Sequence, residues 1–193
     1  YGDLPLTPQP EETRAPVAPA QAGLIRQGEA AYDQGRLPEA RQAGEEVLRQ
    51  DPENARALTL LGWINLQNHA PEEALSYFRR VRVSDERAIV GAALSCYRLG
   101  DVGGAYEVMQ AAYRLRPNPA LVSMASYFAL LAGRVEQAMA ALENVARQSP
   151  RASLPRALLA QIYLVQNRKD AALTEASQAL SLAPGSPMAL LTM

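Results

Sequence analysis

One alanine recurs along this chain at a nearly constant interval, and that interval constrains the fold more than any other feature. The spacings are 34, 31, 33 and 34 residues, between Ala40, Ala74, Ala105, Ala138 and Ala172. A period of about 20 to 50 residues is typical of chains that repeat one supersecondary unit. Such a unit buries its apolar side by stacking on its neighbours. The spacing therefore predicts a solenoid rather than a single globular core.

Two further kinds of position recur with the same period and divide each repeat into two helices. One holds glycine, asparagine or histidine, and the other holds proline. The slot between the two helices, where a left-handed residue ends the first one, is occupied by Gly35, His69, Gly100, Gly133 and Asn167. Second helices are expected to end before a proline, at Pro52, Pro117, Pro150 and Pro184. The second repeat has no such proline, which accounts for its short spacing.

Helix starts follow from proline and acidic residues. Pro38 and Pro71 lie near the start of a second helix, where a missing N–H costs little. Asp170 is expected to cap the last second helix. The five repeats so defined span residues 21–54, 55–85, 86–118, 119–152 and 153–186.

These markers, together with a small residue in helix one at Gly28 and Gly62, resemble the tetratricopeptide repeat family over residues 21–186. The resemblance implies an all-α, right-handed superhelical solenoid of antiparallel helix pairs, whose first helices line a concave face. One marker departs from the family. Its large aromatic residue near the start of helix one is replaced by Leu24, Leu58, Ile89, Val122 and Arg156.

Two segments flank the repeats. Residues 1–20 contain five prolines and no apolar periodicity, which predicts a flexible, proline-rich linker. Residues 187–193 follow Gly185-Ser186 and read as the start of a capping or further helix.

Catalysis and cofactor binding find no support in the residue pattern. His69 is the one histidine and Cys96 the one cysteine, so a metal site or a nucleophile paired with a histidine is hard to build. Cys96 is expected in the interface between helices. The net charge of -1 gives no footprint for nucleic acid, and no run of 18 apolar residues suggests direct membrane insertion. We expect a protein that is not an enzyme and has no cofactor.

A binding face is expected on the first helices, where the resemblance places the concave groove. Aromatic and arginine side chains, which tend to carry binding energy, recur there, and such a groove suits an extended segment or an amphipathic helix. The predicted partner-binding residues are Tyr32, Arg56, Trp63, Leu66, Arg87, Leu94, Tyr97, Arg98, Tyr127 and Leu130. Leu131, Leu164 and Val165 hold matching positions in the last two repeats.

The family's clamp for acidic C-terminal tails is not expected, because Gly91 stands where the clamp needs an arginine. The acidic residues are also unevenly distributed. The first repeat carries a charge of -3, whereas each later repeat carries +1. Such a gradient orients a partner more than it binds one.

The sequence thus predicts a non-catalytic scaffold or adaptor for a protein or peptide partner. Eighteen arginines against one lysine, together with the proline-rich lead, suggest a bacterial envelope machine for pilus, secretion or exopolysaccharide export. That setting implies a periplasmic or membrane-tethered protein, and otherwise a cytoplasmic one. Two alternatives remain open. One is a docking arm of a larger enzyme or transport protein. The other is a structural repeat that self-associates through its C-terminal end, around Met188, Leu190 and Leu191.

Overall fold

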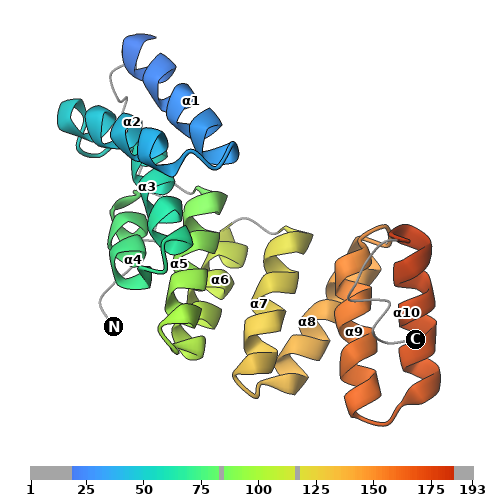
Figure 1. Cartoon of the computed structure of the whole chain (residues 1–193). Helices are drawn as coiled ribbons and strands as arrows, with labels where there is room; N and C mark the ends of the chain where they lie inside the picture. The colour runs from blue at the N-terminus through green and yellow to red at the C-terminus, as the bar shows by residue number, and fades with distance from the viewer. Residues whose placement is uncertain (1–18, 83–84, 116–117, 185–193) are drawn as a thin grey trace. The chain divides into compact units, whose positions relative to one another are not determined.

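The computed structural model describes residues 19–82, 85–115 and 118–184, and within these ranges it contains ten helices and no strand (Figure 1). The expected all-α fold is confirmed. The helices are α1 (Pro19–Asp33), α2 (Leu37–Gln50), α3 (Ala55–Gln67), α4 (Pro71–Arg80), α5 (Glu86–Arg98), α6 (Val102–Leu115), α7 (Pro119–Leu131), α8 (Val135–Gln148), α9 (Ser153–Val165) and α10 (Lys169–Leu182).

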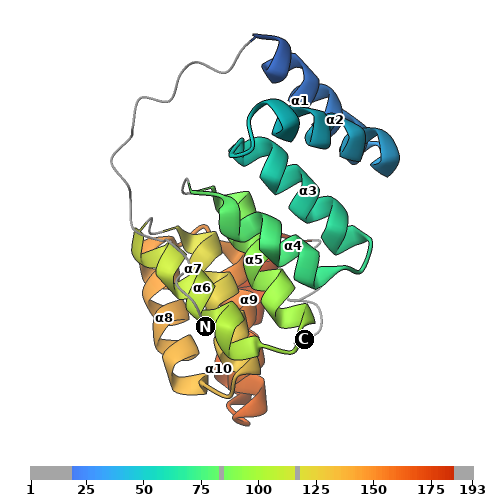
Figure 2. The same cartoon turned by 90° about the vertical axis from the view of Figure 1, so that its left-hand side faces the viewer.

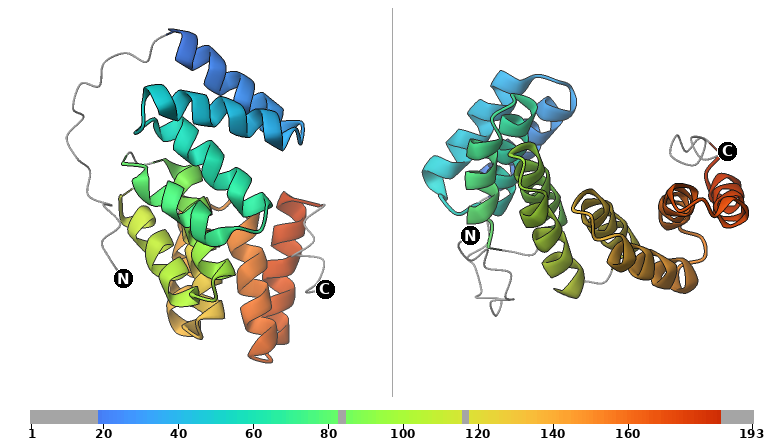
Figure 3. Two further views of the ribbon diagram at one scale, coloured as in Figure 1. Left: turned by 60° about the vertical axis from the view of Figure 1, so that its left-hand side comes forward. Right: turned by 90° about the horizontal axis from the view of Figure 1, so that it is seen from below.

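The chain divides into two compact units, Tyr1–Val108 (unit 1) and Met109–Met193 (unit 2), and α6 crosses the division. In unit 1 each helix from α1 to α5 packs on the next, and the first helices α1, α3 and α5 also contact one another in order (Figure 2). In unit 2, α7 to α10 pack in the same sequence, and α7 contacts α9 (Figure 3). The predicted helix pairs are therefore present in both units.

The turn inside each pair has the expected left-handed residue. Positive φ angles occur at the three glycines of the slot, and His69 and Asn167 both have a φ of 58°. Around His69 the N–H of Ala70 donates to the carbonyl of Asn65 at 2.9 Å, which closes the end of α3 as in a Schellman motif. His69 is thus a helix-terminating residue.

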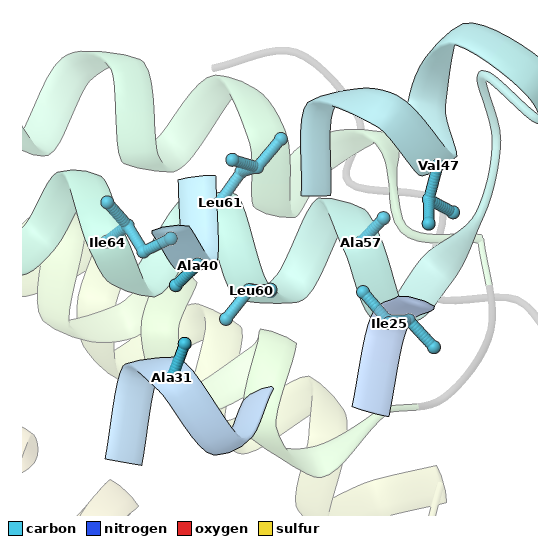
Figure 4. Packing of buried hydrophobic residues seen from close by; sticks show 8 residues of the cluster. All are labelled: Ile25, Ala31, Ala40, Val47, Ala57, Leu60, Leu61 and Ile64. Atoms are coloured by element: carbon cyan, nitrogen blue, oxygen red, sulfur yellow. The ribbon is translucent and has the colours of Figure 1, made fainter. Parts of the chain in front are cut away.

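The recurring alanines are buried in every repeat. They allow two helices to approach closely, and Gly28 does the same in α1, where an added Cβ would lie 2.9 Å from the Cβ of Ala43. Figure 4 shows the resulting core of unit 1, which α1, α2 and α3 build together. Its buried residues are Ile25, Ala31, Ala40, Val47, Ala57, Leu60, Leu61 and Ile64.

Helix lengths explain the one short interval in the repeat. The second helix α4 has 10 residues, whereas α2 and α8 have 14 each and end two residues before their closing prolines. Cys96 is buried, as expected, and this burial raises the pKa of its thiol.

One expected cap is wrong, and some segments lie outside the described residues. Helix α10 begins at Lys169, and Arg168 holds the cap position. Asp170 therefore lies in the first turn, where its negative charge interacts favourably with the positive end of the helix dipole. Helix α1 begins at Pro19, within the predicted linker. The rest of that linker, Pro117 and residues 187–193 are outside the described ranges.

Candidate partner-binding site

Polar contacts join the first helices of unit 1 side by side. The Nε of Arg56 in α3 donates to Oε1 of Glu29 in α1 at 3.1 Å, and its Nη2 donates to Oε2 of the same carboxylate. The hydrogen bond to Glu29 is the main cause of the raised pKa of Arg56. A planar guanidinium held by two parallel bonds has a fixed orientation. Arg56 therefore ties α3 to α1.

A second contact joins α3 to α5. The hydroxyl of Thr59 donates to Oδ2 of Asp85 at 2.9 Å. The other oxygen of Asp85 accepts from the backbone N–H of Arg87 at 2.9 Å and so caps α5. Asp85 is not among the residues predicted for the site, although an aspartate just before a helical pattern is a known start signal. This residue sets where α5 begins relative to α3.

These contacts surround a hollow of about 310 Å³ on the first helices of unit 1. Its lining residues come from α1, α3 and the start of α5, and they are Glu29, Arg56, Thr59, Leu60, Asp85 and Arg87. Both carboxylates in the hollow are engaged by the contacts above. The guanidinium of Arg87 makes no hydrogen bond or ion pair with any residue in the described ranges. Arg87 is exposed and is thus an accessible charged group in the lining of the hollow.

Tyr32 lies within electrostatic reach of this arginine. Burial raises the pKa of the Tyr32 phenol, and the positive charge of Arg87 partly opposes the rise. The ring also packs on the core of unit 1 and is only half-buried. Tyr32 is therefore a partly accessible ring whose phenol is influenced by the charge of Arg87.

Three predicted residues lie toward the C-terminal ends of α3 and α5. Tyr97 is exposed. Arg98 donates through Nη1 to the backbone carbonyl of Leu66, in the last turn of α3, where a cation is favoured. The side chain of Leu66 is only 3% exposed. It contributes to packing, and a partner would meet Tyr97 and the outer part of Arg98 instead.

Trp63 and Leu94 are half-buried on the same helices. The indole of Trp63 meets the ring of Phe78 edge to face, with centroids 6.0 Å apart and planes at 74°. Its Nε1–H is buried and has no acceptor among the described residues. Trp63 is therefore partly a packing residue as well as a candidate for binding.

The other two predicted residues, Tyr127 and Leu130, belong to α7 in unit 2. Tyr127 is exposed and its ring lies 5.8 Å from that of Phe128, at 63°. Leu130 is half-buried and packs on the core of unit 2. Eight of the ten predicted residues thus share the first helices of unit 1, and two lie on the first helices of unit 2.

The described residues contain neither a metal-binding cluster nor a helix that could span a membrane. No group of three or more histidine, cysteine, aspartate or glutamate side chains comes close enough together there to hold a metal ion. Among the helices described, none combines the length and the apolar character needed to cross a membrane.

Sequence comparison agrees with this architecture of helical repeats. Residues 25–89 and residues 129–192 each match a family model described as "Tetratricopeptide repeat". The chain belongs to the tetratricopeptide repeat family. No curated protein is similar enough in sequence to match it.

Solved structures with a similar fold include bacterial pilus proteins. PilF of Pseudomonas aeruginosa is 17% identical with a TM-score of 0.76, and the match covers 90% of this chain and 81% of that one. PilW, described as a widely conserved type IV pilus biogenesis factor, is 16% identical with a TM-score of 0.75, over 89% and 81% of the two chains. YrrB, described as having an unusual peptide-binding site, is 17% identical with a TM-score of 0.66, over 87% and 89%. At these identities the likeness concerns the fold.

Proposed function

We propose that this chain is a non-catalytic scaffold that holds a segment of a partner protein against the first helices of unit 1. The observation that carries the proposal is the exposed guanidinium of Arg87, which lines the hollow and has no hydrogen bond or ion pair among the described residues. Exposed Tyr97 lies farther along the same helix. Arginine and tyrosine are the side chains most often found to dominate binding energy.

The surrounding contacts favour binding without rearrangement. Arg56 and Thr59 fix α1, α3 and α5 relative to one another through bonds that a partner does not need to break. A rigid face loses little conformational entropy on binding. An extended segment or an amphipathic helix of the partner would lie across the three helices, with a carboxylate or carbonyl oxygen at Arg87.

We further propose that the partner belongs to a machine of the bacterial envelope. The fold likeness to PilF and PilW supports this setting, and the peptide-binding site named for YrrB supports segment binding within the family. These proteins share the fold of this chain, and a direct binding experiment tests whether they share the setting.

The test is affinity capture from a lysate of the source cells, followed by measurement of the dissociation constant for the captured protein. Wild-type chain is compared with an Arg87→Ala, Tyr97→Ala variant, in which two exposed side chains are truncated. We expect the variant to bind at least about ten-fold more weakly, which corresponds to 1.4 kcal/mol.

A matched control removes exposed side chains of a second helix. Glu72→Ala, Arg79→Ala in α4 changes the surface without touching the first helices. The control should retain wild-type affinity. Equal loss in both variants, or none in either, would remove the site from the first helices of unit 1.

A further inference from the structure

The first helices of unit 2 expose large apolar side chains that unit 1 does not expose at the same repeat positions. Leu131 closes α7 and Val165 closes α9, and their repeat equivalents in unit 1 are Asp33, Gln67 and Arg98. The side chain of Val165 is 89% exposed, and Leu131 is also exposed. The last position of the first helix thus changes from polar in unit 1 to apolar in unit 2.

Two neighbours extend this surface into a strip. Tyr127 lies one helical turn before Leu131 on α7, and Leu164 directly precedes Val165 on α9, and both are exposed. Helices α7 and α9 contact each other, and packed helices have axes roughly 8 to 10 Å apart. One helix or strand of a partner can therefore cover side chains from both. We call Tyr127, Leu131, Leu164 and Val165 the apolar strip.

Cationic residues follow the strip at the same end of the helix pairs. Arg134 comes three residues after Leu131, and Arg168 comes three residues after Val165. Arg168 and Lys169 line a hollow in the turn between α9 and α10, and the guanidinium of Arg168 is held 4.4 Å from the ring centre of Tyr163. Asp170 lines the same hollow and Glu136 follows Arg134, so three cations outnumber two carboxylates. This end of unit 2 is thus apolar and keeps a net positive charge.

Unit 2 as a whole also carries a net positive charge. Residues 109–193 carry eight arginine and lysine residues but four aspartate and glutamate residues, whereas residues 1–108 carry eleven and sixteen. Complementary charge raises the association rate and rejects partners of like charge. An acidic partner is therefore favoured at unit 2.

We propose that the apolar strip binds an amphipathic partner helix whose apolar side is bordered by glutamate or aspartate. This proposal rests on the proposed function and adds the chemistry of the partner. Leucine-like side chains of the partner would cover Leu131 and Val165, and its acidic residues would meet the cations that follow them. Burial of apolar side chains drives association, so the strip supplies affinity and the cations supply selection.

The test uses designed peptides with the full-length chain. The probe is a fluorescein-labelled helix with leucines at i, i+3, i+4 and i+7 and with glutamate on its other side. Its twin has lysine in place of glutamate, and a third peptide has the composition of the first with its leucines scrambled. Fluorescence anisotropy should give at least about ten-fold tighter binding for the glutamate helix than for the other two.

Matched variants locate the binding. Leu131→Ser, Val165→Ser should lose the glutamate helix, whereas Leu173→Ser, Leu182→Ser, which changes exposed leucines of α10 outside the strip, should keep it. Circular dichroism confirms that each variant is folded. Absent binding, equal binding of the lysine twin, or equal binding by both variants would overturn the proposal.

Two other occupants have their own signatures, and each would also overturn the proposal. Binding that appears only after Leu190→Ser, Leu191→Ser would assign the strip to the chain's own C-terminal segment. A sedimentation mass that rises with concentration in wild type, but not after Leu131→Ser, Val165→Ser, would assign it to a second copy. If the captured partner is lost with Arg87→Ala, Tyr97→Ala but not with the strip variant, the proposed function stands and this inference fails alone.

Discussion

The ring of Phe78 fills the space in front of Gly91. A Cβ built on Gly91 in α5 would lie 2.2 Å from the ring Cζ, and one on Gly62 in α3 would lie 2.5 Å from Cε1. The aromatic ring of one second helix therefore packs on two neighbouring first helices that lack side chains at the contact. This packing also explains why the clamp arginine expected at Gly91 in other family members has no room here.

The substitution Gly91→Ala should destabilise unit 1. The ring of Phe78 also packs against Gly62 and contacts the ring of Trp63, so it has little room to move away from an added methyl group. Overpacking of a close-packed core costs about 1 to 3 kcal/mol. Urea denaturation followed by circular dichroism measures the change.

The control for this prediction is Gly103→Ala in α6. A Cβ there would meet only the carboxylate of Asp101, at 3.8 Å. Replacing glycine by alanine where the backbone conformation allows it stabilises a protein by about 0.4 to 1 kcal/mol, so this variant should be at least as stable as wild type. A Gly91→Ala protein as stable as the control would show that the ring has space to shift.

A second prediction concerns the indole N–H of Trp63. A buried donor without an acceptor costs about 1 to 3 kcal/mol, so removing it compensates for part of the lost ring. We expect Trp63→Phe to change the free energy of unfolding by less than about 1 kcal/mol, whereas Trp63→Ala should cost about 3 to 5 kcal/mol in the limit of full burial. A large loss in the Trp63→Phe protein would mean that the N–H has an acceptor after all.

The repeat could be read from the sequence because its markers act locally. His69 and Asn167 adopt the left-handed conformation that their position in the period predicts, and the central alanines are buried because two helix backbones must approach there. Each such requirement involves a residue and its own turn or partner helix. A period in the sequence is therefore enough to reveal it.

The candidate site could be predicted only in outline. The period placed Leu66 and Tyr97 at equivalent positions, yet Leu66 is buried and Tyr97 is exposed. Nothing in the local sequence states that Arg98 reaches the carbonyl of Leu66, or that Arg87 is left unpaired, because both depend on contacts between repeats. The periodicity predicts which face of a helix a residue lies on. Whether its side chain is exposed, and which group it bonds to, depends on the packing of neighbouring repeats.

A third prediction is a loss of stability at alkaline pH through Tyr163. Burial, and then the hydrogen bond that its hydroxyl donates to Glu143 at 2.8 Å, raise the pKa of this phenol in the folded state. The folded chain then holds a proton that the unfolded chain releases near pH 10. The stabilisation is complete below that pH and is lost as pH rises through the folded-state pKa.

The measurement is the free energy of unfolding in urea between about pH 8 and pH 11. The Tyr163→Phe protein should show a smaller decrease over the alkaline part of this range than wild type. Tyr32, whose pKa burial also raises, should retain its own contribution in that variant. Identical pH dependence of the two proteins would contradict the assignment to Tyr163.

The last prediction compares two ion pairs that differ in burial. Arg156, which replaces the family's aromatic residue, donates to Glu175 of α10 at 3.0 Å, and the two side chains are 15% and 20% exposed. Arg82 and Glu53 are 3.3 Å apart, but their side chains are 70% and 51% exposed. Solvent screens the second pair and leaves the first largely unscreened.

Arg156→Ala should therefore cost about 1 to 3 kcal/mol, since it removes a charged hydrogen bond and leaves Glu175 poorly solvated. Arg82→Ala should cost less than about 1 kcal/mol. A double-mutant cycle with Glu175→Gln isolates the coupling from the packing of the arginine stem. A coupling energy near zero would mean that Arg156 stabilises the structure through its stem and through its bonds to Gln178 and the carbonyl of Ala146, and not through the Glu175 carboxylate.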